Sequence, residues 1–357
     1  LYLYAGFLFC SSDVAFGEAV FTAKPYPIKA LWVQTTNFLA CEGWNPKLHY
    51  ETLENVEFTV GVDHFMTPTM QFADVLLPAA TLPEKNSVNA IWDKIGPIVK
   101  VIDPPGECKS DPEICLEVGK RLNPKAWPWK NDIEMLDELL KPAGVTFEEL
   151  KKRVYLYPPY TYRKHEKGLV RPDGKPGFNT PSGKIELAVG FGGKWKEWGY
   201  DPLPYHTEPP ESPISTPEIY KEYPLVLTSG GRVSVFHHSE HRQLPWLREC
   251  RPYPIVTIHP DTAKGLGISD GEWVYIETRR GRCKMKAKLD LGMDPKVVHA
   301  DHGWWYPEKP GTEPELFGVW ESNINLCVPT ANVCGVTGFS ASYKSSLCKV
   351  YRAEGEV

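Results

Sequence analysis

The sequence lacks a strong charge of either sign and lacks any long apolar run, and each absence excludes a class of protein. Its net charge of −5 gives no general attraction for nucleic acid or for an anionic membrane surface. No apolar run approaches the roughly 20 residues that a membrane-spanning helix needs. We therefore expect no nucleic-acid partner and no direct membrane insertion, and the choice between cytoplasm and periplasm stays open.

The sequence also lacks the cysteine spacing of a metal site. None of the nine cysteines forms a C-x-x-C pair, and the closest spacings are Cys108 to Cys115 and Cys327 to Cys334. This pattern argues against an iron–sulfur or structural zinc site in these residues, and it shows no disulfide framework. Buried, reduced thiols are the favoured interpretation.

Proline is abundant instead, and its distribution predicts the domain organisation. Many of the 34 prolines lie within residues 157–224, where long helices are excluded because proline breaks helical hydrogen bonding. We predict an extended connector over residues 157–221, between an α/β region at residues 1–156 and a barrel domain at residues 222–357. The opening LYLYAGFLFC follows no charged segment and no initial Met, so we expect a piece of a longer chain.

Hydrophobic patterning predicts a parallel α/β unit near the start. Residues 28–34, 58–62 and 75–77 are typical of strands, and a helix is expected at about residues 47–55 between the first two. Three later helices are predicted: residues 110–122, which Ser110 can cap; a helix with a stripe of Ile133, Leu136 and Leu140; and one that begins with a capping box of Thr146 and Glu149.

After residue 222, short strands dominate the pattern. The strand candidates, separated by turns, are YPLVLT, YPIVTI, EWVYIET and KVVHA. Cys283, Met285, Ala287 and Leu289 alternate with basic residues, which indicates a strand with one buried and one solvated face. One short helix, HPDTAKGLGI, is expected to end at Gly267. The pattern predicts a compact β-barrel with little helix.

Two polar residues at predicted strand ends are candidate ligand contacts. Asn37 lies in the turn after the first strand, and Asp63 ends the next one. Ligands bind at this edge of open α/β sheets because the loops diverge there. The amide suits a base or a ribose, and the carboxylate suits a guanine edge or a ribose hydroxyl. Helix or turn capping is the alternative role, and the pattern alone favours capping.

A second candidate segment, SGGRVSVFHHSEHRQ, follows the first strand of the predicted barrel. Gly231 lets the backbone approach a ligand closely, and Arg232 offers a planar fork suited to phosphate or to a pterin edge. Four polar side chains follow: His237, His238, Ser239 and His241. A metal site is one alternative, because H-H-x-x-H resembles the spacing of metal ligands on a helix. The β-branched residues Val233 and Val235 argue against a helix here. A surface loop is the other.

Two further segments lie near the end of the sequence. ADHGWWYPE places His302, Trp304, Trp305 and Tyr306 together after a predicted strand, although tryptophans often just cover the edge of a core. ESNIN contains Asn323 and Asn325, which would face the same way in a strand.

Taken in order, these segments resemble the molybdopterin oxidoreductase family, also called the dimethyl sulfoxide reductase family. The resemblance covers nearly the whole chain and rests on order and spacing. The matching segments are PYPIKALW, TTNFLACEGWNP, VDHFMTPTMQFADVLLPAATLPE, GECKSDPEICLEVGKRL, FNTPSGKIEL, YPLVLTSGGR, VTIHPDTAKGLGISDGEWVYIET, HGWWYPE and ESNIN. HGWW and HSEHRQ are similar to a branch that contains acetylene hydratase and thiosulfate- or polysulfide-reductase-like proteins.

The resemblance implies a fold and a set of cofactors. Family enzymes bind two molybdopterin guanine dinucleotides around one molybdenum or tungsten atom. Residues 1–156 would be part of a three-layer α/β dinucleotide-binding region, and residues 222–357 would be a double-psi β-barrel that closes over the cofactors. The metal-ligating residue and a 4Fe-4S cluster would lie in a missing N-terminal half. We therefore expect no catalytic and no metal-ligating residue in this sequence, and no activity from it alone.

By motif position, the resemblance assigns seven cofactor contacts. Asn37 and Asp63 would lie near a guanosine, although TTN stands here where many relatives have Gly-x-Asn-Pro. The pterin and phosphate contacts would be Gly231, Arg232, His238, Ser239 and Asn325. His238 and Arg242 would lie near the substrate funnel, and neither is assigned a catalytic role.

Three functions fit the resemblance. The first is the cofactor-holding C-terminal half of an oxidoreductase that acts on a small molecule, with an electron-transfer iron–sulfur subunit as a possible partner. The second is a non-redox hydratase with the same cofactor. The third is a separate subunit that holds the cofactor for a partner chain.

Overall fold

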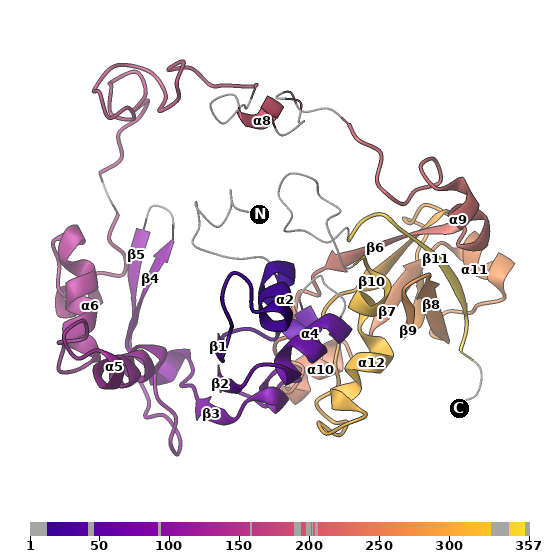
Figure 1. Ribbon diagram of the computed structural model, residues 1–357, viewed down its shortest axis with the longest axis horizontal. Coiled ribbons are helices and arrows are strands. Elements are labelled where there is room, and N and C mark those ends of the chain that lie inside the picture. Colours follow the sequence, from indigo (N-terminus) through magenta and orange to yellow (C-terminus); the bar gives the residue numbers. More distant parts are fainter. Residues whose placement is uncertain are drawn as a thin grey trace. The chain divides into compact units, whose positions relative to one another are not determined.

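The computed structural model describes residues 13–41, 46–91, 94–157, 159–188, 194–197, 201, 203, 206–329 and 343–353 (Figure 1). The chain forms two compact units: Leu1–Leu77 together with Thr207–Val357, and Pro78–His206. Within the described residues, no helix is long and apolar enough to cross a membrane. The predicted boundaries at residues 156 and 221 stay predictions.

The α/β segment of the first unit contains a three-stranded sheet in the order β1-β2-β3. Strand β1 (Ala30–Gln34) pairs in parallel with β2 (Phe58–Asp63), and β3 (Val75–Pro78) follows. Helix α4 (Pro46–Glu54) connects the first two strands, which confirms the predicted strand–helix–strand unit. Helix α2 (Asp13–Thr22) approaches α4 closely at Gly17, where a Cβ would lie 3.2 Å from the Thr52 hydroxyl.

The C-terminal segment of the same unit forms the predicted barrel, which is closed in the order β10-β6-β11-β8-β9-β7. Its strands are β6 (Leu225–Gly231), β7 (Ile255–Ile258), β8 (Trp273–Thr278), β9 (Gly281–Leu289), β10 (Val297–Asp301) and β11 (Ser346–Arg352). The pairs β6–β10 and β7–β9 are parallel. The remaining neighbours, β7–β10, β6–β11, β8–β11 and β8–β9, are antiparallel.

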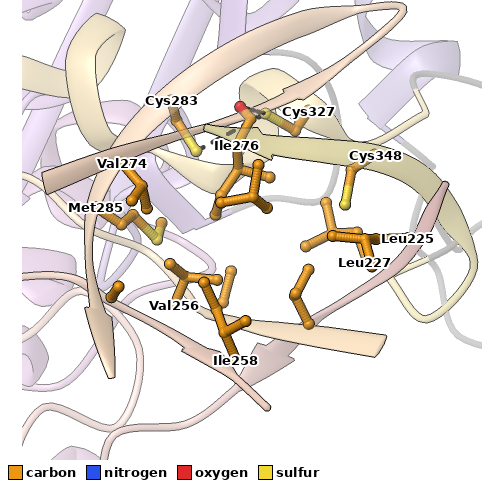
Figure 2. Packing of buried hydrophobic residues seen from close by; sticks show 14 of the residues in the cluster. Leu225, Leu227, Val256, Ile258, Val274, Ile276, Cys283, Met285, Cys327 and Cys348 are labelled. Carbon is orange, nitrogen blue, oxygen red and sulfur yellow. Dashed lines mark hydrogen bonds between the residues drawn. The ribbon is translucent and has the colours of Figure 1, made fainter. Parts of the chain in front are cut away.

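The barrel core mostly follows the predicted alternation along β9. Cys283, Met285 and Ala287 are buried, and they pack against inward-facing residues of the other strands, among them Val256 and Ile276 (Figure 2). The alternation was wrong at Lys284, which was expected on the solvated face and is buried. Helix α11 (Pro260–Leu266) ends as predicted at Gly267, which adopts a left-handed conformation with a φ of 68°. The barrel is therefore specified locally, by strand periodicity and one glycine.

The second unit combines three short helices with a hairpin. Helix α5 (Asp111–Leu122) is capped by Ser110, α6 (Asp132–Leu140) follows, and α7 (Phe147–Lys151) begins with the predicted capping box of Thr146 and Glu149. The sequence did not predict the antiparallel strands β4 (Ser87–Ile91) and β5 (Lys94–Ile98). Side chains of both strands pack against the buried faces of α6 and α7.

The remaining helices are short, as expected for proline-rich and loop segments. They are α3 (Phe38–Cys41), α8 (Lys194–Glu197), α9 (Pro217–Glu222), α10 (Pro245–Cys250) and α12 (Val319–Ser322).

A buried carboxylate anchors the segment that leads into the barrel. Glu211 is only 5% exposed and accepts two hydrogen bonds from Arg280, at 2.9 and 2.6 Å. Arg279 Nε lies 2.7 Å from the same carboxylate. Burial alone would raise the pKa of Glu211, but hydrogen bonds and charges from Arg280 and Arg279 hold it below its usual value.

We expect Glu211→Gln to lower the melting temperature by about 4–8 °C, because the largely buried charge of Arg280 loses its partner at a cost of about 2 kcal/mol. A lowered carboxylate pKa stabilises the fold above the unfolded pKa, so the difference from the wild type should shrink as the pH falls below the unfolded value of 4.5 and through the lower folded pKa. Glu218→Gln, which breaks an exposed pair with Lys221, is the control and should have little effect. Equal melting temperatures at pH 7 would contradict this interpretation.

Thiol reactivity should follow burial. The Sγ atoms of Cys283 and Cys327 lie 3.8 Å apart in the barrel core, and burial raises the pKa of Cys283 and of Cys348 far above the ordinary range. Cys250 is exposed. We expect iodoacetamide to label Cys250 in the folded protein and to reach the three core thiols only after denaturant is added, as read by peptide mass spectrometry. Fast labelling of Cys283 in the folded protein would contradict the barrel packing.

Candidate functional site

The turn after β1 meets a barrel loop through Asn37. Its Nδ2 donates to the Ser239 hydroxyl at 3.2 Å, and its Oδ1 accepts from the Thr69 hydroxyl at 2.8 Å. Both Asn37 and Ser239 are buried. The backbone carbonyl of Asn37 also accepts from the amides of Ala40 and Cys41, so this residue begins α3. Two of the predicted contact residues, 202 positions apart, are thus brought together.

The ESNIN segment reaches the other end of α3. Asn323 Nδ2 donates to the carbonyl of Ala40 at 3.0 Å, and Asn325 Nδ2 lies 3.5 Å from the same oxygen. The segment is not a strand: residues Ile324–Cys327 form a 3-10 helix that begins after Asn323, whose side chain accepts from the Asn325 amide. Both side chains are fully buried, and Asn325 lies close to the segment that contains Asn37.

The loop after β6 carries the predicted glycine, arginine and histidines. Gly231 has no space for a side chain, since a Cβ there would lie 2.2 Å from His299 Nε2. Arg232 and His237 are exposed, and His237 has a left-handed backbone with a φ of 59°. The H-H-x-x-H residues lie in turns and not on a helix. In the part of the chain that the structure describes, no three His, Cys, Asp or Glu side chains gather closely enough to hold a metal ion.

Asp63 ends β2 as predicted and is half-buried. Burial raises the pKa of its carboxyl, and the negative charge of Glu240 on the barrel loop adds to the effect. The backbone amides of His64 and Phe65 act in the opposite direction. Asp63 is therefore within electrostatic reach of the loop that contains His238 and Ser239.

Arg242 holds this loop, a structural role beyond the sequence-based expectation that it lies near a substrate funnel. It is 2% exposed, and its Nη1 and Nη2 donate to the backbone carbonyls of His238 and His302 at 2.9 and 3.2 Å. The guanidinium lies 4.7 Å from the ring centroids of both Phe236 and Trp304. Burial lowers the pKa of Arg242 to about 9. The adjacent HHSEHRQ and HGWW motifs were the available signal.

His302 joins His238 at the centre of this arrangement. The two rings meet edge to face, with centroids 5.2 Å apart. Burial, followed by the charges of neighbouring His238, Arg242 and Arg232, lowers the pKa of His302 to about 4. Burial also lowers the pKa of His238. Both imidazoles are therefore neutral at pH 7.

Both imidazoles also retain hydrogen-bonding capacity. Among the described residues, Nδ1 of His238 and Nδ1 of His302 are buried and have no hydrogen-bond partner. The same holds for the indole Nε1 of Trp304. A buried polar atom without a partner costs about 1–3 kcal/mol, so this cluster fits contact with a polar ligand.

Comparison with known proteins places these features in a family. Residues 11–121 match the family model described as Molybdopterin oxidoreductase, and residues 225–345 match the Molydopterin dinucleotide binding domain. The chain belongs to the molybdopterin oxidoreductase family. The two matches contain all the residues of the site described above, from Asn37 to Asn325.

Individual relatives within the molybdopterin oxidoreductase family cover most of this chain. Acetylene hydratase of Syntrophotalea acetylenica is 36% identical over 307 residues, which is 85% of this chain and 40% of that protein. Dopamine dehydroxylase of Eggerthella lenta is 34% identical over 82% of this chain and 35% of that protein. Dimethyl sulfoxide reductase DmsA of Escherichia coli is 29% identical over 78% and 37%.

A solved structure agrees with this assignment. Acetylene hydratase from Pelobacter acetylenicus superposes with a TM-score of 0.86 and 31% identity, covering 97% of this chain and 47% of that chain. The present chain thus spans less than half the length of the molybdopterin oxidoreductase relatives that it matches.

Buried neutral histidines should make the fold sensitive to acid. Burial lowers the pKa of His49 to about 4, from an unfolded value of about 6.5. Such a group stabilises the fold above the unfolded pKa, and the contribution is lost as the pH falls toward 4. At pH 5 the loss is about 2 kcal/mol, so His49→Leu should show a smaller fall in melting temperature between pH 7 and pH 5 than the wild type. His206→Leu, which replaces an exposed histidine, is the control. An equal fall in melting temperature in all three proteins would contradict the role of His49 as a buried, neutral histidine.

Proposed function

We propose that this chain holds a molybdopterin guanine dinucleotide in an enzyme whose metal, molybdenum or tungsten, is ligated by a residue outside residues 1–357. The observation that carries the proposal is the convergence of the predicted binding segments. Asn37 hydrogen-bonds Ser239, Asn325 reaches α3, and beside them lie the imidazoles of half-buried His238 and buried His302, each with a buried Nδ1 that has no partner among the described residues. The resemblance of the chain to family enzymes further leads us to expect two such cofactors around one metal.

The side chains at this place fit the chemistry of the cofactor. Arg232 is exposed and suited to a phosphate, since a guanidinium matches the geometry of phosphate oxygens. The neutral rings of His238 and His302 can each donate or accept one hydrogen bond at Nδ1. Asp63, whose raised pKa shows that its charge is poorly solvated, can accept from the amine edge of guanine. The expected guanosine, pterin and phosphate contacts thus all have residues of matching chemistry.

The proposal divides the work between cofactor and protein. When bound, the cofactor and its metal supply the electron-transfer or atom-transfer chemistry, whereas the protein binds, orients and shields it. The barrel is expected to be of the double-psi type, and its two parallel pairs, β6–β10 and β7–β9, support this. By its resemblance to family enzymes, a 4Fe-4S cluster is expected in a part of the protein outside this chain, which spans 40% of acetylene hydratase.

The oxidoreductase reaction has one specific rival, a hydratase. The match to acetylene hydratase, at 36% identity, favours a non-redox addition of water. The match to dopamine dehydroxylase, at 34% identity, does not favour an addition of water. We propose the oxidoreductase first because relatives named as reductases include dimethyl sulfoxide reductase and thiosulfate reductase. Turnover of the full-length enzyme with a reduced viologen dye and a reducible small molecule supports it, and hydration of an alkyne without any dye supports the hydratase.

Cofactor content tests the proposal directly. The full-length protein that contains this chain should carry a pterin, detected as its fluorescent oxidation product, with molybdenum or tungsten and GMP after acid hydrolysis. Arg232→Gln should lower cofactor affinity roughly 10- to 100-fold, because a charge-assisted hydrogen bond contributes about 1.5–3 kcal/mol. Arg163→Gln, which removes an exposed arginine of the second unit, is the matched control. Protein without pterin and without guanine nucleotide would contradict the proposal.

A further inference from the structure

One guanidinium joins two segments that are far apart in the sequence. Arg242 donates to the carbonyl of His238 four residues before it and to the carbonyl of His302, 60 residues after it. Both bonds originate from the same planar group, so the two carbonyls are held at a fixed separation. Arg242 therefore sets the distance between the loop after β6 and the HGWW segment.

Two aromatic rings beside Arg242 explain why an arginine occupies this position. Phe236 and Trp304 are fully buried, meet each other edge to face, and each have their ring centroid 4.7 Å from the guanidinium carbon. A flat, delocalised cation can pack against this aromatic pair and still donate in its own plane, whereas a lysine ammonium cannot. Arg248 also lies over Trp304, at 5.0 Å, but it donates to the exposed carboxylate of Glu308. Arg248 thus contacts the same ring but neither histidine carbonyl.

Close backbone approach completes the arrangement. Gly303 has a left-handed φ of 66°, and a Cβ there would lie 3.1 Å from the His238 carbonyl oxygen. The glycine after His302 therefore lets the two segments touch. As a result the rings of His238 and His302 lie 5.2 Å apart, and each has a buried Nδ1 without a partner among the described residues.

We propose that His302 is a second imidazole contact to the bound cofactor, beside His238, and that Arg242 is the positioning residue that holds the two rings as a pair. This inference rests on the proposed cofactor-binding function. It assigns a ligand contact to the HGWW segment, in which Trp305 donates to the Ser239 carbonyl and packs in the core.

Substitutions of His302 separate a ligand contact from a structural role. His302→Leu places an apolar side chain at a buried position and removes the Nδ1 atom that has no partner among the described residues. The cofactor-free variant should therefore be as stable as the wild type or more stable. His302→Asn keeps a polar group near the position of Nδ1. In the full-length enzyme purified with its cofactor, we expect His302→Leu to speed the release of pterin about tenfold on warming, and His302→Asn to release it nearly as slowly as the wild type.

Arg242 and Arg248 form a matched pair of variants. Arg242→Lys should speed pterin release about as much as His302→Leu, and the double variant should be no faster than either single variant, because both remove the same contact. Arg248→Lys should lower the melting temperature without changing the release of pterin. If Arg242→Lys fails to fold, the two His302 variants still decide whether His302 contacts the cofactor.

The outcomes distinguish this inference from the proposed function. Wild-type enzyme that carries no pterin overturns both. Wild-type enzyme that carries pterin, together with an unchanged release rate in His302→Leu, overturns the His302 contact alone. Release that is equally fast in His302→Asn and His302→Leu also overturns it, because a hydrogen bond at Nδ1 would then have no role. Additive effects of Arg242→Lys and His302→Leu overturn the positioning role.

Discussion

The buried polar junction between the β1 turn and the barrel determines the geometry of the site. Asn37 hydrogen-bonds Ser239, and Asn323 hydrogen-bonds the carbonyl of Ala40, so both ends of the four-residue helix α3 are tied to barrel segments. Buried amides and hydroxyls are costly when unpaired, so these bonds specify one arrangement of the two segments. The loop of His238 and the HGWW segment are then held by Arg242 beside this junction.

Local features of the fold could be predicted from the sequence because local physics determines them. Ser110 and Thr146 cap helices through contacts three residues away, and Gly267 ends a helix by its own conformation. The hairpin β4–β5 could not be predicted in this way. Both strands are only five residues long, and KIGPI contains a glycine and a proline, which disfavour a strand; the stability of the hairpin comes from packing against α6 and α7.

For the candidate site, individual residues could be predicted, but the contacts between them could not, because those contacts are not local in the sequence. The resemblance pointed to Asn37, Ser239 and Asn325, and the structure brings their segments together. The partner of each residue lies about 200 to 285 positions away, so no spacing rule could connect them. The resemblance also placed Arg242 near the substrate funnel, but its contacts could not be predicted, because they exist only in three dimensions, where one guanidinium packs against two rings and reaches two carbonyls.

In the proposed arrangement, the Nδ1 atoms of His238 and His302 face a pterin held by this junction. The decisive measurement is a structure of the full-length enzyme with its cofactor bound. We expect pterin or phosphate atoms within about 3.5 Å of both Nδ1 atoms, with the guanosine toward Asn37 and Asp63. A cofactor bound elsewhere in the molecule, with both imidazoles hydrogen-bonded only to protein, would contradict it.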